Sequence, residues 1–121
     1  MNTRIVHCQK EKYDVYIGRA NPRKRLTKSI FANPYVIGKD GTRQEVMAKY
    51  RAHVELLIKR SPMFALAVRN LHCKTLGCWC WQSPCERILP PDQQICHGDI
   101  FAEISQRLFL ESEALKLTRP I

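Results

Sequence analysis

The sequence TRQE at residues 42–45 is a capping box, and it limits the fold of this 121-residue chain more tightly than any other feature. In a capping box the side chain of Thr42 accepts a hydrogen bond from the amide of Glu45, whose carboxylate accepts one from the amide of Thr42. Apolar residues then recur at helical spacing, at Val46, Tyr50, Val54, Leu57 and Ile58. This pattern predicts a helix that begins here, continues to about residue 60, and packs an apolar stripe against a sheet.

Three short segments have the composition of β-strands. Residues 4–8, 14–18 and 75–80 concentrate β-branched, aromatic and other apolar side chains. Because helical segments lie between them, the sequence predicts a small single α/β domain over residues 1–121. Its sheet should be short, mixed or mostly parallel, and flanked by helices. Ligands in such proteins bind beyond the carboxyl ends of the strands.

Two further helices follow the first one. Ser61 before Pro62 is typical of a capped helix start, which predicts a short helix over residues 63–68. A final helix should begin at Asp99, since apolar residues then recur along one side at Ile100, Ile104 and Leu108. The chain has no apolar run of the roughly 20 residues that cross a bilayer, and its N-terminal segment lacks the apolar centre of a signal peptide. We therefore expect a soluble, cytoplasmic protein without a membrane partner.

Positive charge is concentrated in the first half of the chain. The formal net charge is +9, and residues 1–60 hold 14 Lys and Arg against 5 Asp and Glu, whereas residues 61–121 hold 6 of each. Such an excess favours polyanionic partners. Nucleic acid and phosphorylated small molecules are the two classes that it indicates.

An irregular loop is predicted from residue 19 to residue 40, where two Asn-Pro pairs interrupt any regular pattern. Loops of this length in compact domains are usually functional or disordered. Five cations fall within ten residues at its start, at Arg19, Arg23, Lys24, Arg25 and Lys28. They suit a ligand that carries one phosphate group, because aromatic residues for stacking single-stranded nucleic acid are sparse nearby. A solvated loop whose charges only maintain solubility is the alternative.

Most of the cysteines and two of the histidines lie between residues 72 and 97. No export signal is present, so the six cysteines should be free thiols or metal ligands rather than disulfides. Zinc takes four ligands at the corners of a tetrahedron. The predicted zinc ligands are Cys78, Cys80, Cys96 and His97.

A reactive thiol is the second interpretation of the same residues. If Cys96 and His97 lie at the start of the last helix, the amides of its first turn would stabilise a thiolate or a bound anion. Cys96 would then be the nucleophile, with His97 and Asp99 as the other candidate catalytic residues. Asp99 could instead only stabilise the helix dipole, and the cysteines could be buried small hydrophobes. These alternatives remain open at the level of sequence.

Four motifs occur in order along the chain: DVYIGR, NPYVIGKDGTRQEVMAKYRAHV, LGCWC and CHGDIFAEI. Over about residues 13–108 they resemble a small bacterial and phage family, the domain of unknown function family 4326. The segment from residue 81 to residue 91 looks longer than the usual connection in that family, so Cys85 is the least secure member of any metal set. The resemblance singles out Gly18, Arg19, Asn33, Pro34, Tyr35, Cys78, Trp79, Cys80, Cys96, His97, Gly98 and Asp99.

These patterns predict one pocket that joins the basic loop to the cysteines and histidine. The candidate ligand-binding residues are Gly18, Arg19, Arg23, Arg25, Asn33, Pro34 and Tyr35. The leading hypothesis is a small α/β enzyme or binding domain for a nucleotide-like or otherwise phosphorylated molecule. The alternative is a non-catalytic, zinc-stabilised module that binds nucleic acid or a larger assembly. A third hypothesis is a phage accessory protein whose cysteines only pack in the core.

Overall fold

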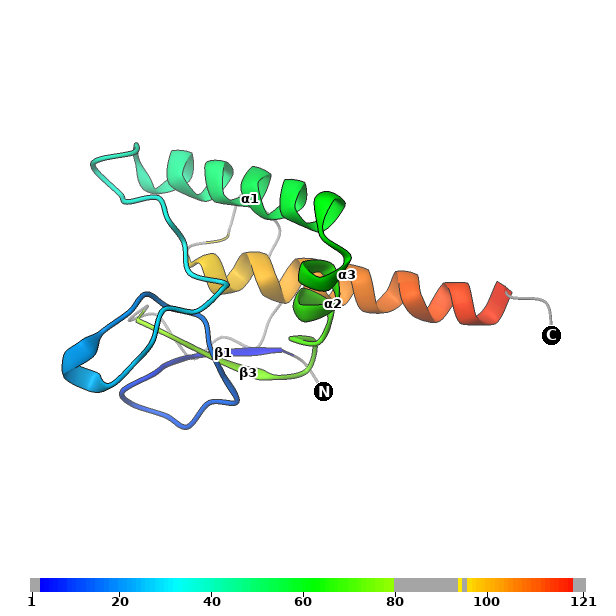
Figure 1. The fold of residues 1–121 in the computed structure, drawn as a ribbon, viewed down its shortest axis with the longest axis horizontal. Helices are drawn as coiled ribbons and strands as arrows, with labels where there is room; N and C mark the ends of the chain where they lie inside the picture. The colour runs from blue at the N-terminus through cyan, green and yellow to red at the C-terminus, as the bar shows by residue number, and fades with distance from the viewer. Residues whose placement is uncertain (1–2, 80–93, 95, 119–121) are drawn as a thin grey trace.

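The computed structural model describes residues 3–79, 94 and 96–118. Within these residues, three helices and a three-stranded parallel sheet form a small α/β domain, which confirms the predicted fold class (Figure 1). The helices formed by the described residues are not long and apolar enough to cross a membrane. In chain order the elements are β1 (Arg4–His7), β2 (Val15–Tyr16), the 3-10 turn η1 (Pro22–Lys24), α1 (Arg43–Arg60), α2 (Pro62–Arg69), β3 (Thr75–Cys78) and α3 (His97–Thr118).

The sheet has the strand order β1-β3-β2, and both pairs are parallel. The central strand is therefore the last one in sequence, and its end at Cys78 lies opposite His7 of β1. β2 is shorter than predicted, although the amide of Ile17 still donates to the carbonyl of Gly77 at 2.9 Å. β3 ends at Cys78 rather than at residue 80, which lies outside the described residues. The carboxyl ends of β2 and β3 thus meet at one edge, where the predicted pocket was expected.

Local signals account for the first two helices. The capping box of α1 is confirmed, because the amide of Glu45 donates to Thr42 Oγ1 at 3.3 Å and the amide of Thr42 donates to Glu45 Oε1 at 3.1 Å. α2 begins at Pro62, and the Ser61 hydroxyl accepts the amide of Phe64 at 3.1 Å. In Figure 1 the three helices lie on one side of β1 and β3, and the C-terminal half of α3 extends beyond the rest of the domain.

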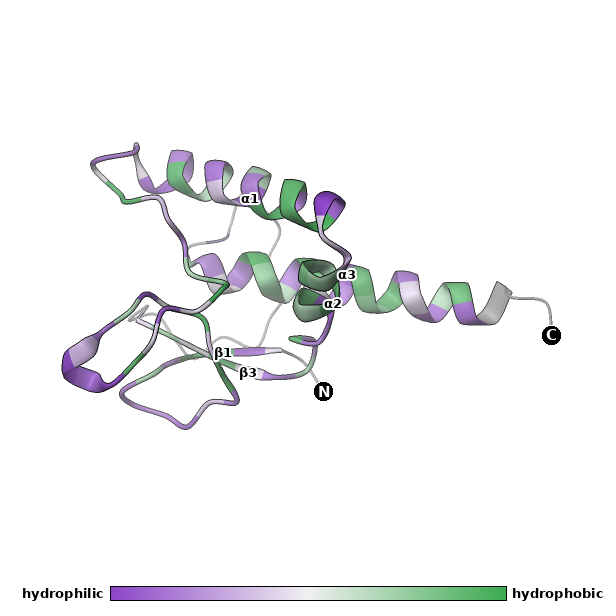
Figure 2. Ribbon diagram, in the orientation of Figure 1, coloured by the Kyte–Doolittle hydropathy of each residue, from purple (hydrophilic) through white to green (hydrophobic). Residues whose placement is uncertain are grey.

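The hydrophobic core joins the sheet to the helices and to the irregular loop. Figure 2 shows hydrophobic residues concentrated where α2 and α3 meet. Phe31 of the loop is buried in this core, and the buried hydroxyl of Tyr50 donates a hydrogen bond to its carbonyl. The loop between β2 and α1 is therefore anchored at its midpoint. The largest fully buried side chains of the helices and strands are Ile5, Val6, Tyr50, Val54, Val68, Leu76, Cys78, Ile100, Phe101 and Ile104.

The start of α3 differs from the prediction, because the helix begins at His97 and not at Asp99. Cys96 precedes it, and its Sγ accepts the amide of Gly98 at 3.4 Å while its own amide donates to Asp99 Oδ2 at 3.1 Å. Cysteine is not among the residues that usually cap helices, so no capping pattern marks this helix start. A Cβ on Gly98 would lie 2.9 Å from Ile5 Cγ1, which explains the glycine as a close approach of α3 to the sheet.

Candidate functional site

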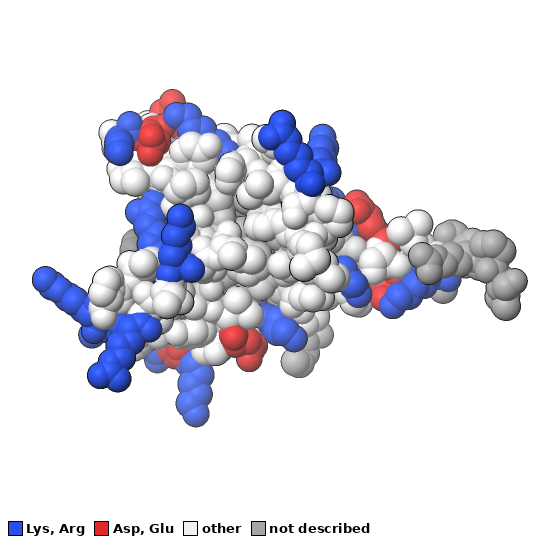
Figure 3. Space-filling view, viewed as in Figure 1, with Lys and Arg blue, Asp and Glu red and all other residues white. Residues whose placement is uncertain are grey.

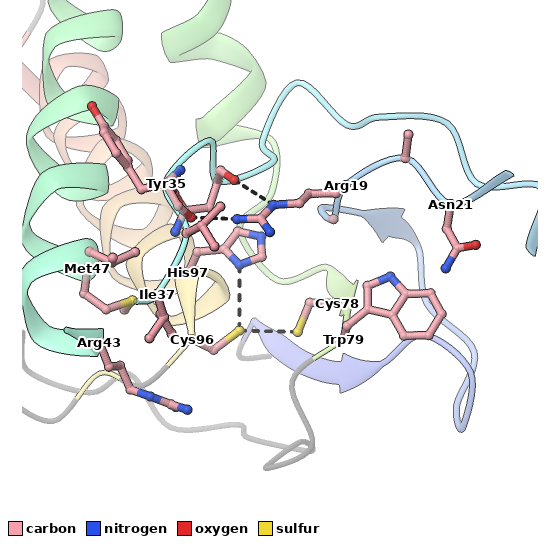
Figure 4. Close-up of a pocket in the computed structure, with 15 residues that line it drawn as sticks. Arg19, Asn21, Tyr35, Ile37, Arg43, Met47, Cys78, Trp79, Cys96 and His97 are labelled. Atoms are coloured by element: carbon pink, nitrogen blue, oxygen red, sulfur yellow. Dashed lines mark hydrogen bonds between the residues drawn. The ribbon is translucent and has the colours of Figure 1, made fainter. Parts of the chain in front are cut away.

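A cavity of about 620 Å³ opens beyond the carboxyl ends of β2 and β3 (Figure 4). The irregular loop, the first turns of α1 and the start of α3 complete its walls. The fold thereby brings most of the predicted pocket residues together although they are up to 79 positions apart in sequence. Those that line the cavity are Gly18, Arg19, Asn33, Tyr35, Cys78, Cys96 and His97. The described lining does not include Pro34, Arg23, Arg25 or Asp99.

Arg19 shapes one wall of the cavity by binding the backbone of its own loop. Its Nε donates to the carbonyl of Asn33 at 3.0 Å, and its Nη2 donates to the carbonyl of Tyr35 at 2.6 Å. Asn33 stabilises the same turn, because its Oδ1 accepts the amide of Tyr35 at 2.9 Å. The loop is therefore closed by a guanidinium, and the Asn-Pro-Tyr sequence supplies the carbonyls that the guanidinium needs.

Replacing Arg19 with glutamine should open this loop and lower the free energy of unfolding by about 1–2 kcal/mol, because two hydrogen bonds from a partly hydrated charged group are lost. Urea denaturation measures the stability change, and limited proteolysis between residues 31 and 40 measures the opening. Arg23→Gln is the matched control, since Arg23 is exposed on the same loop and does not line the cavity. Equal stability and equal cleavage in both variants would show that the Arg19 hydrogen bonds do not hold the loop closed.

Trp79 forms the outer edge of the cavity and is 39% exposed. Its indole N–H donates to Tyr16 Oη at 2.7 Å, and this hydroxyl donates to the carbonyl of Arg19 at 2.6 Å. The sequence predicts Trp79 on the face opposite Cys78, but both residues line the cavity because β3 ends before the alternation continues. An exposed indole held by a hydrogen bond can offer one face to a planar ligand.

Two thiols and an imidazole lie together at the start of α3. Cys96 Sγ is 3.3 Å from Cys78 Sγ and 4.0 Å from His97 Nδ1 (Figure 4). His97 Nε2 lies 2.7 Å from the carbonyl of Ile17, a distance at which the Nε2–H donates to that oxygen. This tautomer leaves the lone pair of Nδ1 on the side of Cys96. A thiol and a neutral imidazole nitrogen are the pair that proton transfer needs, and the transfer requires Sγ and Nδ1 to approach more closely than 4.0 Å.

The carboxylate of Asp99 lies outside this cluster. Asp99 is 3% exposed, and its Oδ2 accepts the amide of Cys96, so it holds the turn that carries the thiol. It is therefore placed as a positioning residue rather than as a base that touches a ligand.

Burial lowers the pKa of His97, and the nearby positive charge of Arg19 lowers it further. The hydrogen bond to the Ile17 carbonyl and the carboxylate of Asp99 oppose this shift without cancelling it. The imidazole is therefore neutral at pH 7. A neutral imidazole can accept a proton from Cys96, which an imidazolium cannot do.

The lowered pKa of His97 predicts a loss of stability in acid. Below its ordinary pKa of about 6.5, the unfolded chain takes up a proton that the folded chain does not. The free energy of unfolding should therefore be greatest above pH 6.5 and fall as the pH drops toward the lowered pKa, by at most about 1.4 kcal/mol per pH unit. Urea denaturation between pH 5 and pH 8 measures this slope.

His97→Gln should flatten that pH profile. His53→Gln is the control, because His53 carries the same side chain on α1 and is absent from the described lining of the cavity. A His97→Gln profile as steep as that of the unmodified chain would contradict a neutral, buried His97.

The predicted zinc site is only partly within the described residues. Cys78, Cys96 and His97 are neighbours, whereas Cys80 and Cys85 lie outside the residues that the structure describes. Within the described ranges, no three His, Cys, Asp or Glu side chains are placed to hold a metal ion. Zinc therefore stays a prediction, which elemental analysis of the purified protein would test.

Several lining residues are not among the candidate site residues that the sequence identifies. Arg43 reaches the cavity from the first turn of α1, Asn21 from the loop, and an apolar wall is formed by Ile37, Val46 and Met47. Their contribution depends on how α1 packs against the loop. Two signals could have identified Arg43: the capping box, which places it in the first turn of α1, and the motif NPYVIGKDGTRQEVMAKYRAHV, which contains it.

A protein-family model matches the part of the chain that contains the cavity lining. The model described as Domain of unknown function (DUF4326) matches residues 3–107. The chain belongs to DUF4326. The match begins before β1, ten residues earlier than the resemblance in the motifs, and includes all the described residues that line the cavity. Searches of curated proteins and of solved structures find no match. The function of this DUF4326 domain is therefore argued from its cavity.

Proposed function

We propose that the cavity binds a small phosphorylated, nucleotide-like molecule and holds it beside Cys96. The observation that carries the proposal is the charge of the lining: the described residues include Arg19 and Arg43 but no Asp or Glu. Two guanidinium groups in the described lining favour an anion. Arg19 uses its Nε and Nη2 to bind loop carbonyls, and a guanidinium has further N–H groups that can donate to a phosphate. Figure 4 shows the two side chains at different ends of the lining, so the phosphate is assigned to the end where Arg43 lies, because Arg19 already binds loop carbonyls.

The size and the remaining lining support a ligand with a planar ring. A volume of about 620 Å³ is within the range of about 300–1,000 Å³ that is usual for small-molecule sites. Ile37 and Met47 contribute an apolar wall, and Trp79 offers an indole face at the edge. A base or similar ring can stack on that face, as bases stack on aromatic side chains elsewhere.

Cys96 is the residue that would act on such a ligand. Its Sγ accepts the amide of Gly98 in the first turn of a 22-residue helix, where the helix dipole stabilises negative charge. His97 Nδ1 lies 4.0 Å away as a proton acceptor. The chemistry that this pair supports is nucleophilic attack by the Cys96 thiolate on an electrophilic atom of the bound molecule.

Equilibrium binding of adenosine, AMP and ribose 5-phosphate, measured by calorimetry, tests the proposal. Arg43→Gln should weaken binding of the phosphorylated probes at least tenfold, equivalent to about 1.4 kcal/mol, and leave adenosine nearly unchanged. Lys59→Gln is the matched control, because Lys59 is exposed near the other end of α1 and is absent from the described lining. Failure of every phosphorylated probe to bind, or equal loss in both variants, would refute the phosphate site.

A second candidate function is nucleic-acid binding through the outer surface of the loop between β2 and α1. The position of the cations in this loop favours that function. Arg23, Lys24 and Arg25 are exposed and do not belong to the cavity lining. Figure 3 shows basic side chains projecting from the end of the molecule where η1 lies. This binding would be independent of Cys96.

Salt dependence separates the second candidate from the first. If the three cations contact phosphates, the slope of log K against log salt for single-stranded DNA should become shallower by about 2 in a chain with all three changed to glutamine. The same substitutions should not affect AMP binding. Affinity for DNA that does not change with salt would exclude this candidate.

A further inference from the structure

The sulfur atoms of Cys78 and Cys96 lie close together, although the two residues stand at opposite ends of the segment that connects β3 to α3. Their Sγ atoms are 3.3 Å apart, although the two residues are 18 positions apart in the sequence. Cys78 is the last residue of β3, and Cys96 directly precedes α3, so two regular elements fix the pair. A disulfide bond is about 2.0 Å long, which means that the sulfurs need to approach by about 1.3 Å to form one.

The two thiols are not equivalent. Cys78 is 1% exposed and Cys96 is 8% exposed, and both line the cavity, so an incoming molecule reaches Cys96 first. Cys96 also has the amide of Gly98 directed at its sulfur from the first turn of α3. A thiol at a helix N-terminus forms the thiolate more readily, and the thiolate is the nucleophile in disulfide exchange. Cys96 is therefore the attacking residue and Cys78 the resolving one.

We infer that Cys78 and Cys96 are a redox-active dithiol that exchanges with small-molecule disulfides of the glutathione type. The Cys96 thiolate attacks one sulfur of the disulfide, whose sulfur–sulfur bond breaks, and the first small thiolate leaves with the proton that Cys96 gave up. Cys78 then attacks Cys96 Sγ, and the second small thiolate leaves with the proton of Cys78. The two protein thiols are oxidised to one disulfide, and the small disulfide is reduced to two thiols.

Disulfide exchange by Cys78 and Cys96 does not depend on the proposed phosphate site. The oxidation state of the two cysteines would, however, regulate any reaction of Cys96 with a ligand bound there. In the disulfide form Cys96 Sγ is bonded to Cys78, so it can neither act as a nucleophile nor bind a metal ion. The same cavity would then be active only under reducing conditions.

The test is to equilibrate the full chain, freed of metal with a chelator, in reduced and oxidised glutathione, and to map its cysteines by alkylation and mass spectrometry. The oxidised chain should contain a Cys78–Cys96 disulfide. The disulfide should persist when Cys80 and Cys85 are both changed to serine. Its absence from oxidising buffer, or its loss in that double variant, would overturn the inference.

Variants of each cysteine separate the two roles. Cys78→Ser should accumulate the mixed disulfide of glutathione with Cys96 at least tenfold above the unmodified chain, because no resolving thiol remains. Cys78→Ala provides the same test if the serine variant does not fold. Cys96→Ser should form neither product, and Cys73→Ser should behave like the unmodified chain. A Cys78 variant without the mixed disulfide would show that Cys96 is not the attacking thiol.

Discussion

A Cys96→Ser chain is expected to lose the fastest-reacting thiol of the protein while its free energy of unfolding changes by no more than about 1 kcal/mol. Serine is among the best helix-capping residues, so its hydroxyl can accept the Gly98 amide that Cys96 Sγ accepts. The hydroxyl cannot replace the thiolate as a nucleophile toward an alkylating reagent. Alkylation by iodoacetamide, followed by mass spectrometry, measures the reactive thiol, and urea denaturation measures stability.

Cys73→Ser is the control for that experiment, because Cys73 is also a cysteine and is absent from the described lining of the cavity. It should leave the fast phase of alkylation in place. A fast phase that survives Cys96→Ser would assign the reactive thiol to another cysteine. Cys96 packs in the hydrophobic core, so loss of folding in Cys96→Ser would instead indicate that the role of Cys96 is in packing.

Phe101→Ala is expected to lower the free energy of unfolding by about 3–5 kcal/mol, the largest stability change that we predict. Phe101 is fully buried, and its ring centroid is 5.2 Å from that of Phe31 and 5.8 Å from that of Tyr50. Removing the ring leaves a void where α3, α1 and the irregular loop meet. Because Phe31 anchors the loop, the cavity wall should loosen as well, and chemical denaturation with amide hydrogen exchange measures both effects.

Leu110→Ala is the matched control on the same helix. Leu110 is 57% exposed, so its truncation should change stability by less than about 0.5 kcal/mol. A similar loss in both variants would indicate that α3 does not pack on the core as described.

Short sequence patterns predicted the helix starts that depend only on neighbouring residues. The capping box specified the start of α1, and the Ser61-Pro62 pair specified that of α2 within one residue. The start of α3 was predicted two residues late, because a thiol accepting a backbone amide has no recognisable capping pattern. Strand lengths were overestimated because pairing, and not composition, ends β2 and β3.

The sequence identified many of the residues that line the cavity, but not the contacts that those residues make. The motifs identified Arg19, Cys96 and His97, but not that Arg19 binds backbone carbonyls instead of projecting freely as a cation. Arg43 was missed because its place in the cavity depends on how α1 packs against the loop. Such long-range packing is not encoded in any short pattern.

The most direct measurement of ligand binding beside Cys96 is the rate at which iodoacetamide alkylates Cys96 with and without saturating AMP, with adenosine as the matched compound lacking phosphate. A phosphorylated molecule whose phosphate is held by Arg43 would cover the approach to the thiol. We predict that AMP slows alkylation of Cys96 at least tenfold, that adenosine has a much smaller effect, and that Arg43→Gln removes the difference. An alkylation rate that neither AMP nor ribose 5-phosphate changes would contradict the proposed site.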